Sequence, residues 1–496
     1  MKKVAIFLAF AICVAACSSS GEDTSAGSAP IYPDYKDITI PYNIAPLNFM
    51  LTEKASRIRV TVDGKDLICR RGRKAIFNEK RWKDIMFQSA GDTLEIKVSA
   101  KVGGNWKEYD PFVWEVSEDR IDSCITYRLI EPDYEAYNNI VLQQRCVEDF
   151  STDDFSDFRV IGNRCMNCHA YAWQDPDTSM FYVRGKDGGA ILNLSGKLQK
   201  LSIKGDGMIS GSVYFGFSPD KKYIVFSSNK IIPGYHTDAA RRMEVFDTMS
   251  DVYVADLERK EFIGSGCLSR PDMLETFPTF SPDGKYLYYC SAPGMDTVTL
   301  SNIEKVKYSL CRVNFDQATG TIGDVPEIIY DAYSEGHSVC HPKISPDGRF
   351  ICFSIADFGT FPLWHREADL ILMDLEDGKM ITMDNANSRN SDTYHSWSSN
   401  SRWLVFASKR DDGVYGRPYF THITRDGICS KAFVLPQRQP SFYDNLLKSY
   451  NAPEFGKGKL PFDSYDVRKA LEEDPDSFGG VKFPSRELYY SQNEDK

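Results

Sequence analysis

The chain has 496 residues, which is too long for one ordinary hydrophobic core and predicts two or three domains, or a repeat architecture with an accessory domain. Hydrophobic residues make up 42% of the chain and charged residues 26%, which excludes disorder over most of its length, and the 27 tyrosines favour β-structure. The net charge of −11 argues against nucleic acid and anionic lipid head groups as partners.

The first 16 residues have the pattern of a secretory signal peptide. Two lysines precede an apolar run that ends at Ala16 and is too short to span a bilayer. The stretch "VAAC" resembles the lipobox of bacterial lipoproteins, which implies that residues 1–16 are removed and that Cys17 is lipidated. An uncleaved apolar anchor, or cleavage at another bond, is the alternative. Residues 17–30 are predicted to form a flexible tether.

The address of the protein follows from the same resemblance. Residue 18 is Ser rather than the Asp that would retain a lipoprotein at the inner membrane, so we expect an outer-membrane lipoprotein that faces the periplasm or the cell surface. No later apolar run reaches transmembrane length, and we therefore expect lipid to provide the membrane attachment.

Residues 31–130 are predicted to form a small antiparallel β-sandwich of immunoglobulin-like type. The segments "RIRVTVDG", "DTLEIKVSAKVGG" and "PFVWEVSE" alternate apolar and polar residues, with Gly and Asp at the turns. Residues 131–164 are interpreted as a connector to the next domain. Cys69 and Cys124 could pair in an exported protein, although disulfide connectivity cannot be read from sequence.

A repeat occupies most of the remaining chain. Its copies are "YFGFSPDKKYIVFSSN", "FPTFSPDGKYLYYCSA", "HPKISPDGRFICFSIA" and "YHSWSSNSRWLVFASK", with the turn serines at Ser218, Ser281, Ser345 and Ser398. Each copy reads as a strand, a tight turn and a second strand, and a third strand such as 250–262 follows. A degenerate copy at 169–185 has Asp175-Pro176-Asp177 at its turn. Four strands per copy is the unit of a β-propeller blade.

The segments "SPDGKYLYY" and "SPDGRFICF" resemble the WD40-like (PD40) repeats of TolB-type β-propellers over residues 165–435. The resemblance implies an all-β fold with five to six four-stranded blades, preceded by the β-sandwich. Unrelated hairpins that share common turn chemistry are the alternative. The C-terminal extension, residues 436–496, could wrap the propeller or close it by completing a blade.

The stretch "RCMNCHAY" carries the attachment signature of a c-type haem. In C-x-x-C-H two cysteines form thioethers with the haem vinyl groups, and the adjacent histidine is an axial iron ligand. Cys165, Cys168 and His169 hold these positions, which predicts one haem c in the first blade. A thioredoxin-like pair would need a βαβ unit, and a zinc site would need a second ligand pair nearby. A plain disulfide, or two free thiols, remains open.

The second axial ligand is predicted from the expected blade geometry. His169 starts an innermost strand, and most other histidines are expected on the same face of the propeller. His395 is the first prediction, because closure of the ring should bring the last blade beside the first. The alternatives are His365, His236, His341, Met180 and Met208, whereas His422 is expected on the opposite face. Tyr171, Trp173, Tyr394 and Trp397 could pack against the porphyrin or belong to the core.

Three functions are consistent with these features. The first is a lipid-anchored cytochrome-like electron carrier with redox or envelope proteins as partners. The second is a non-catalytic TolB-like scaffold that binds an envelope protein or polymer. The third is a peroxidase-like haem enzyme with an open distal site, assisted by a residue such as His365 or Arg366. Motifs of phosphate-binding loops and of serine or zinc hydrolases are absent from the sequence, so we favour a carrier or binding protein over an enzyme.

Overall fold

The computed structural model describes residues 27–132, 139–237 and 241–481. The expected signal peptide, the lipidation site Cys17 and most of the tether lie outside these residues. No helix within the described ranges is long and apolar enough to cross a membrane. Strands dominate the fold, and the predicted all-β class is confirmed.

The N-terminal unit contains two sheets and one helix. The larger sheet has the strand order β2 (Ile38–Pro41), β9 (Phe112–Ser117), β7 (Thr93–Val102), β4 (Arg57–Val62) and β5 (Lys65–Arg71), with β8 (Asn105–Glu108) paired to β7. The smaller sheet consists of β1 (Ile31–Tyr32), β3 (Phe49–Leu51) and β6 (Lys74–Ala75), and the helix is α1 (Glu79–Gln88). The alternating burial along β4 and β7 matches their alternating sequence and shows one face of the larger sheet packed on the core.

Helix α1 was not expected in a β-sandwich. It begins after Asn78, whose side chain accepts a hydrogen bond from the Arg81 N–H, and it turns Trp82 into the core. The indole of Trp82 packs edge-on against Trp114 with ring centroids 5.4 Å apart, and it donates a 2.8 Å hydrogen bond to the Ile44 carbonyl. The helix therefore covers the sheet with apolar surface that the strands alone do not supply.

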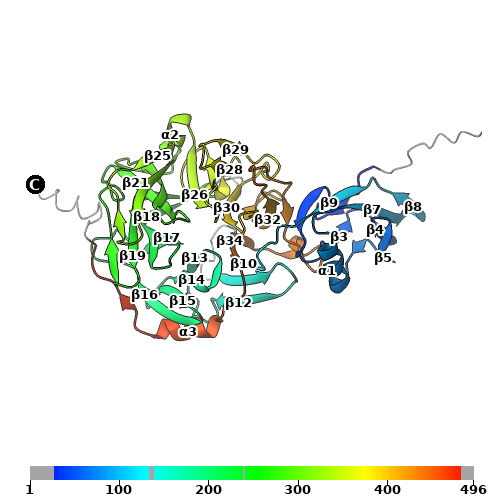
Figure 1. The fold of residues 1–496 in the computed structure, drawn as a ribbon, viewed down its shortest axis with the longest axis horizontal. Helices are drawn as coiled ribbons and strands as arrows, with labels where there is room; N and C mark the ends of the chain where they lie inside the picture. The colour runs from blue at the N-terminus through cyan, green and yellow to red at the C-terminus, as the bar shows by residue number, and fades with distance from the viewer. Residues whose placement is uncertain (1–26, 133–138, 238–240, 482–496) are drawn as a thin grey trace, which may run out of the picture.

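Six further sheets surround a common centre in the part of the chain that the structure describes, and Figure 1 shows them as a ring beside the N-terminal unit. The strands of each sheet are given from the innermost outward. One sheet consists of β34 (Ser449–Gly456), β10 (Cys124–Ile130), β11 (Val141–Cys146) and β12 (Thr152–Asp157). The next consists of β13 (Met166–Ala172), β14 (Asp175–Val183), β15 (Gly189–Leu194) and β16 (Lys197–Ser202), and the third of β17 (Ser212–Phe217), β18 (Tyr223–Tyr235), β19 (Met243–Asp256) and β20 (Glu261–Ile263).

The other three sheets are β21 (Met273–Phe280), β22 (Tyr286–Pro293), β23 (Ser309–Asp316), β24 (Thr321–Ile322) with β25 (Glu327–Tyr330) also on β23; β26 (Ser338–Ile344), β27 (Phe350–Ala356), β28 (Asp369–Asp374), β29 (Met380–Thr382); and β30 (Asp392–Trp397), β31 (Trp403–Ser408), β32 (Arg417–His422), β33 (Phe433–Val434). Short helical turns at α2 (Ala332–Glu335), η1 (Ile303–Lys305), η2 (Pro362–Trp364) and η3 (Tyr443–Asn445) lie in the connections.

One sheet of the ring combines strands from both ends of the chain, which corrects two predicted boundaries. Residues 131–164 are not a mere connector, because they contain β11 and β12, and β10 belongs to the ring rather than to the sandwich predicted for 31–130. The C-terminal strand β34 pairs antiparallel with β10 and supplies the innermost strand of this closing sheet. The closing sheet lies between β13 and β30. The sheet that contains His395 therefore does not adjoin the first repeat, and the prediction that the two are direct neighbours is wrong.

The rest of the C-terminal extension wraps the outside of the ring. Helix α3 (Ser464–Glu472) starts at a capping box formed by Asp463 and Asp466 and buries Val467 and Leu471 against the closing sheet and the β13 sheet. β35 (Asp476–Ser477) then adds a parallel edge strand to β16. Both predicted roles of this extension, closing and wrapping, are therefore present.

The repeated turns share one hydrogen-bonding pattern that explains why the repeat is visible in the sequence. The Ser345 hydroxyl accepts a 3.0 Å hydrogen bond from the Phe350 N–H and donates a 2.6 Å bond to Asp347. The same two bonds recur at Ser218, Ser281 and Ser398, with Asn400 in place of the aspartate in the last copy. The β13 sheet lacks this serine. Its turn between β13 and β14 lies at Trp173-Gln174, both with positive φ, rather than at the predicted Asp175-Pro176-Asp177.

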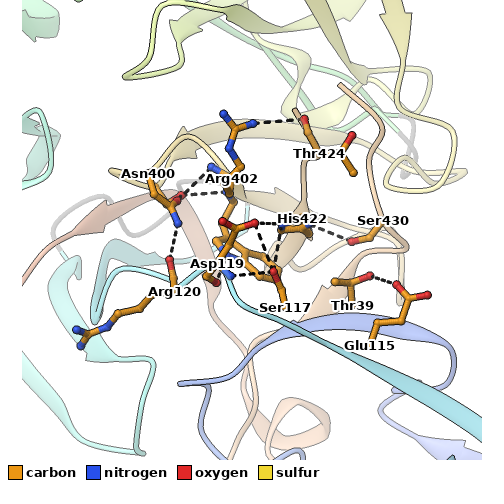
Figure 2. Close-up of polar contacts among 12 residues, drawn as sticks. Thr39, Glu115, Ser117, Asp119, Arg120, Asn400, Arg402, His422, Thr424 and Ser430 are labelled. Atoms are coloured by element: carbon orange, nitrogen blue, oxygen red, sulfur yellow. Dashed lines mark hydrogen bonds and ion pairs between the residues drawn. The ribbon is translucent and has the colours of Figure 1, made fainter. Parts of the chain in front are cut away.

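The N-terminal unit is tied to the last repeat through the contacts in Figure 2. His422 Nε2 lies 2.8 Å from Asp119 Oδ2. The imidazole packs against the Trp403 ring at a tilt of 60°, with ring centroids 4.8 Å apart. Asn400 donates to the Arg120 carbonyl at 2.8 Å. Trp403 Nε1 donates to the Asp119 carbonyl at 2.9 Å. His422 thus has a structural role at the interface between the two units.

Candidate functional site

The innermost strands all contain a β-bulge at the same position. The register shifts lie between Asn167 and Ala170, Val213 and Gly216, Thr276 and Thr279, Cys340 and Lys343, Thr393 and His395, and opposite Ala452-Pro453 in β34. In five of the six strands the first bulge residue has positive φ, at Tyr214 (55°), Phe277 (50°), His341 (55°), Tyr394 (49°) and Ala452 (48°). Such backbone is costly for residues other than Gly and is concentrated at functional sites.

The bulges aim side chains at the centre of the ring. The five positive-φ residues and the residue that follows each of them line one cavity of about 680 Å³. In β13 the same bulge position is occupied by Cys168 and His169, and His169 lines the cavity together with Cys165. The cavity has the size of a typical cofactor pocket, for which about 300–1,000 Å³ is the usual range. The side chain of Cys168 lies outside what the structure describes.

Two histidines of the cavity have ring nitrogens without a hydrogen-bond partner. Both nitrogens of His341 and Nδ1 of His395 are buried in this state. The buried nitrogens of His169 interact only weakly, with the backbone of Thr126 and Ala452. His395 Nε2 donates a 2.8 Å hydrogen bond to the Cys352 carbonyl, which leaves the lone pair on Nδ1. The nitrogens without a partner are available to bind a metal or to hydrogen-bond to a bound molecule.

Burial keeps these imidazoles neutral. It lowers the pKa of His169 to about 3, with a further contribution from the charge of Arg128, and it lowers the pKa of His395 to about 4 against the opposing effect of the Cys352 carbonyl. Burial also holds the pKa of His341 well below its usual range. Neutral imidazole is the form that binds metals.

Aromatic and apolar side chains form much of the remaining wall. His341 lies among Tyr214, Phe277 and Tyr394, with ring centroids 6.3, 4.3 and 4.4 Å away. The long hairpin β18–β19 contributes Ile231, Pro233, Tyr235, Met243 and Val245. Tyr235 is 61% exposed and also lines the cavity, so the cavity meets solvent at this hairpin.

Charged groups are distributed unevenly in the cavity. The lining contains four cations, Arg128, Arg164, Arg184 and Lys343, and one carboxyl group, Glu454. Burial raises the pKa of Glu454 to about 7, although the charge of Lys343 acts in the opposite direction. An uncharged Glu454 leaves the cavity with a surplus of positive charge that suits an anionic ligand group.

The other predicted ligands lie elsewhere. His365 is fully buried with Nε2 2.8 Å from Glu244 and Nδ1 3.2 Å from Glu367, and the cavity lining does not include it. Burial opposes the charged form of His365, but the bonds to Glu244 and Glu367 outweigh burial and raise its pKa to about 9. His236 follows the end of β18 and does not line the cavity.

The two methionines belong to the protein core, and three of the four aromatic candidates do not line the cavity. Met180 and Met208 are buried in the hydrophobic cluster between the first two repeats. Of the four aromatic candidates, the cavity lining includes Tyr394 but not Tyr171, Trp173 or Trp397. No group of three or more His, Cys, Asp or Glu side chains that could hold a metal ion occurs in the described part of the chain.

The recurring bulge has a signal in the repeat that the sequence patterns described above do not include. Tyr214, Phe277, His341 and Tyr394 are each the fourth residue before a turn serine. "AP" at 452–453 corresponds to "FP" at 277–278 and "HP" at 341–342. An aromatic or His at a fixed distance from a turn, in a strand that is otherwise buried, marks a position set apart from the core.

No protein-family model matches the chain, and no curated protein matches it. Several solved structures resemble it at low identity. One is a puromycin-hydrolysing peptidase of Mycobacterium tuberculosis, with 11% identity and a TM-score of 0.36 over 70% of this chain and 52% of that one. Another is prolyl oligopeptidase B from Galerina marginata, with 12% identity and a TM-score of 0.36 over 76% of this chain and 45% of that one.

A protein of the DUF4784 family from Bacteroides caccae matches with 7% identity and a TM-score of 0.26 over 71% of this chain and 95% of that one. The chain thus spans about half the length of the two peptidases. The TM-scores are too low to transfer an activity, and the resemblance to TolB-type repeats stays a prediction.

Proposed function

We propose that the protein is a c-type haem protein that transfers electrons in the cell envelope, with one haem bound in the central cavity. The observation that carries this proposal is the position of the C-x-x-C-H motif. His169 and Cys165 line a cavity that also contains two further histidines with buried nitrogens lacking partners. A motif match in the sequence and an independent set of ligand atoms in the fold thus meet at one place.

The residues of the cavity fit such a group chemically. The haem would be attached through Cys165 and Cys168, with His169 as the proximal ligand. Tyr214, Phe277 and other aromatic side chains offer apolar surface for a porphyrin face. The four cations of the lining suit the two propionate groups, since guanidinium and ammonium groups pair with carboxylates. When bound, haem supplies a one-electron iron couple, whose potential depends on the axial ligands and on burial.

The distal ligand is proposed to be His341, ahead of the sequence-based choice His395. His341 has both ring nitrogens without a partner, whereas the Nε2 of His395 is held by the Cys352 carbonyl. Only Nδ1 of His395 could bind iron, and this nitrogen is bonded to Cγ, the atom that joins the ring to the rest of the side chain. His365 is a poor candidate because each of its ring nitrogens faces a carboxylate, Glu244 or Glu367, and because it does not line the cavity.

The envelope location is part of the same proposal. C-type haem attachment takes place in exported proteins, and the N-terminal pattern of a lipoprotein signal, with Cys17 as lipidation site, is consistent with that requirement. We propose an outer-membrane attachment through lipid, with other redox or envelope proteins as partners. The hairpin residue Tyr235 lies where such a partner could approach the cavity.

Optical spectra of protein made with cytochrome c maturation machinery test the proposal. A six-coordinate low-spin spectrum is expected, and His341→Ala should convert it to high-spin. His395→Ala should shift the potential but keep the low-spin state, and His236→Ala is the matched control from outside the cavity.

Two results would change the assignment. A high-spin spectrum of the unaltered protein would favour the peroxidase-like enzyme with an open distal site. Protein that carries no haem would favour the scaffold whose cavity binds another ligand.

A further inference from the structure

Two cysteines outside the haem motif face one another in the closing sheet. Cys124 on β10 is the direct antiparallel partner of Cys146 on β11, in a stretch of regular register. Residues opposite each other in an antiparallel pair project to the same face of the sheet. Cys124 is 2% exposed and Cys146 is half-buried.

The hydrogen bonds around this pair identify it as the closely spaced type. The Val147 N–H donates a 2.8 Å bond to the Ser123 carbonyl, so the neighbouring residue pair is the hydrogen-bonded one. Hydrogen-bonded and non-hydrogen-bonded pairs alternate along the ladder, and the Cys146 N–H donates outward, to the Ser151 carbonyl at 3.0 Å. Cys124 and Cys146 therefore form a non-hydrogen-bonded pair, whose Cα atoms typically lie about 4.5 Å apart.

This spacing lies within the range of about 4.4–6.8 Å that disulfide bonds require. We propose that Cys124 and Cys146 form a disulfide bond that joins β10 to β11. The inference does not rest on the proposed haem, because neither cysteine belongs to the C-x-x-C-H motif or lines the central cavity. It also replaces the earlier pairing of Cys124 with Cys69, which lies exposed on β5 of the N-terminal unit.

The bond forms by thiol–disulfide exchange, in which a donor disulfide of an oxidoreductase or a small molecule oxidises the two protein thiols. The thiolate of Cys146, the more accessible of the two, attacks one donor sulfur and releases one donor thiolate. The Cys124 sulfur then attacks the Cys146 sulfur, and the second donor thiolate leaves. Two protein thiols are oxidised to one disulfide, and the donor disulfide is reduced to two thiols.

The local environment supports Cys146 as the attacking residue. A hydrogen bond from the Cys124 thiol lowers the pKa of Cys146 to about 7, while the same bond and burial raise the pKa of Cys124. Thiolate is the reactive form, so Cys146 is the better nucleophile near neutral pH.

The position gives the bond a structural consequence. β10 pairs with β34 on one side and with β11 on the other, so it is the strand through which the C-terminal strand is attached to the rest of its sheet. A covalent link between β10 and β11 restricts the unfolded chain over residues 124–146 and favours the closed ring.

Peptide mapping tests the proposal on the full chain, with oxidised glutathione as the disulfide donor and iodoacetamide to block free thiols. Trypsin should release residues 121–128 linked to residues 146–159, since cleavage at Arg120, Arg128, Arg145 and Arg159 separates them. The proposal would be overturned if the two peptides appeared separately after oxidation, each with its cysteine blocked by iodoacetamide. A link between Cys124 and Cys69 would overturn it as well.

Thermal unfolding gives an independent readout. Oxidation should raise the Tm of the unaltered chain by roughly 5 °C over the reduced form. This difference should vanish in Cys146→Ser and persist in Cys69→Ser, the matched control from the N-terminal unit. If Cys146→Ser does not fold, the peptide map of the unaltered chain decides by itself. Equal Tm values for the oxidised and reduced chain would refute the stabilising role.

Discussion

Replacement of Ser345 by alanine should weaken the ring by removing one of the repeated turn hydroxyls. The Ser345 side chain is buried, and its oxygen accepts a 3.0 Å hydrogen bond from the Phe350 N–H. Without the oxygen this buried N–H has no acceptor, which costs about 1–3 kcal/mol. Asp347 also loses the 2.6 Å bond from Ser345, but it retains the Arg349 N–H and the Arg402 guanidinium.

The combined effect on the free energy of unfolding is therefore expected to be about 2 kcal/mol, most of it from the Phe350 N–H. Urea denaturation followed by tryptophan fluorescence should show a lower midpoint with an unchanged slope. Ser301→Ala, at an exposed serine that bonds to the Thr299 hydroxyl, is the matched control and should change stability by less than about 0.5 kcal/mol. A Ser345→Ala chain as stable as the control would refute the role assigned to the turn serines.

Two further perturbations test the fold. The pKa of His365 is raised to about 9, so its pairing with Glu244 and Glu367 stabilises the fold fully below the unfolded-state pKa and loses that contribution as pH rises through about 9. The free energy of unfolding, measured by urea titration, should fall by about 3 kcal/mol between pH 6.5 and 9.5. A Glu244→Gln/His365→Gln double variant should show a smaller fall over the same pH range. A chain ended after Lys448 lacks β34 and should fail to unfold cooperatively, whereas a chain ended after Lys459 keeps β34 and should retain a calorimetric transition; equal behaviour of the two would contradict ring closure by β34.

The repeat was predictable because its chemistry is local. A serine hydroxyl that caps the N–H five residues later, with an Asp or Asn two residues on, produces "SPD" or "SSN" in the sequence wherever the turn occurs. The alternating pattern of β4 and β7 is likewise a local consequence of one buried face. These features were sufficient to predict the all-β class and the arrangement of most sheets.

The ring closure was not predictable from such patterns. β34 pairs with a strand more than 300 residues earlier, at Cys124↔Gly456 and its neighbours, and no turn serine follows it because no second strand comes after it in its sheet. β11 and β12 do not read as strands in the sequence because "VLQQRC" and "TDDFSD" have little apolar alternation. Their faces are covered by the β13 sheet and by α3, which lies about 300 residues later in the chain.

The candidate site was predictable in part for the same reason. The C-x-x-C-H motif is local, and the repeat predicted that His341 and His395 lie on the same propeller face as the motif. In the structure both line the cavity. The exclusion of His365 depends on Glu244, which the β19 strand brings to it across 121 positions of the chain. The contribution of the β18–β19 hairpin depends on its extension beyond β17, which the sequence pattern did not mark.

Covalent haem in the full-length protein tests the central proposal most directly. The protein should be produced in an exported form with cytochrome c maturation machinery, denatured, separated by electrophoresis and stained for haem, with a pyridine haemochrome spectrum of the same sample. We expect haem that stays with the polypeptide after denaturation in the unaltered chain and is lost in a Cys165→Ala/Cys168→Ala variant. A correctly folded, exported chain without covalent haem would contradict the account.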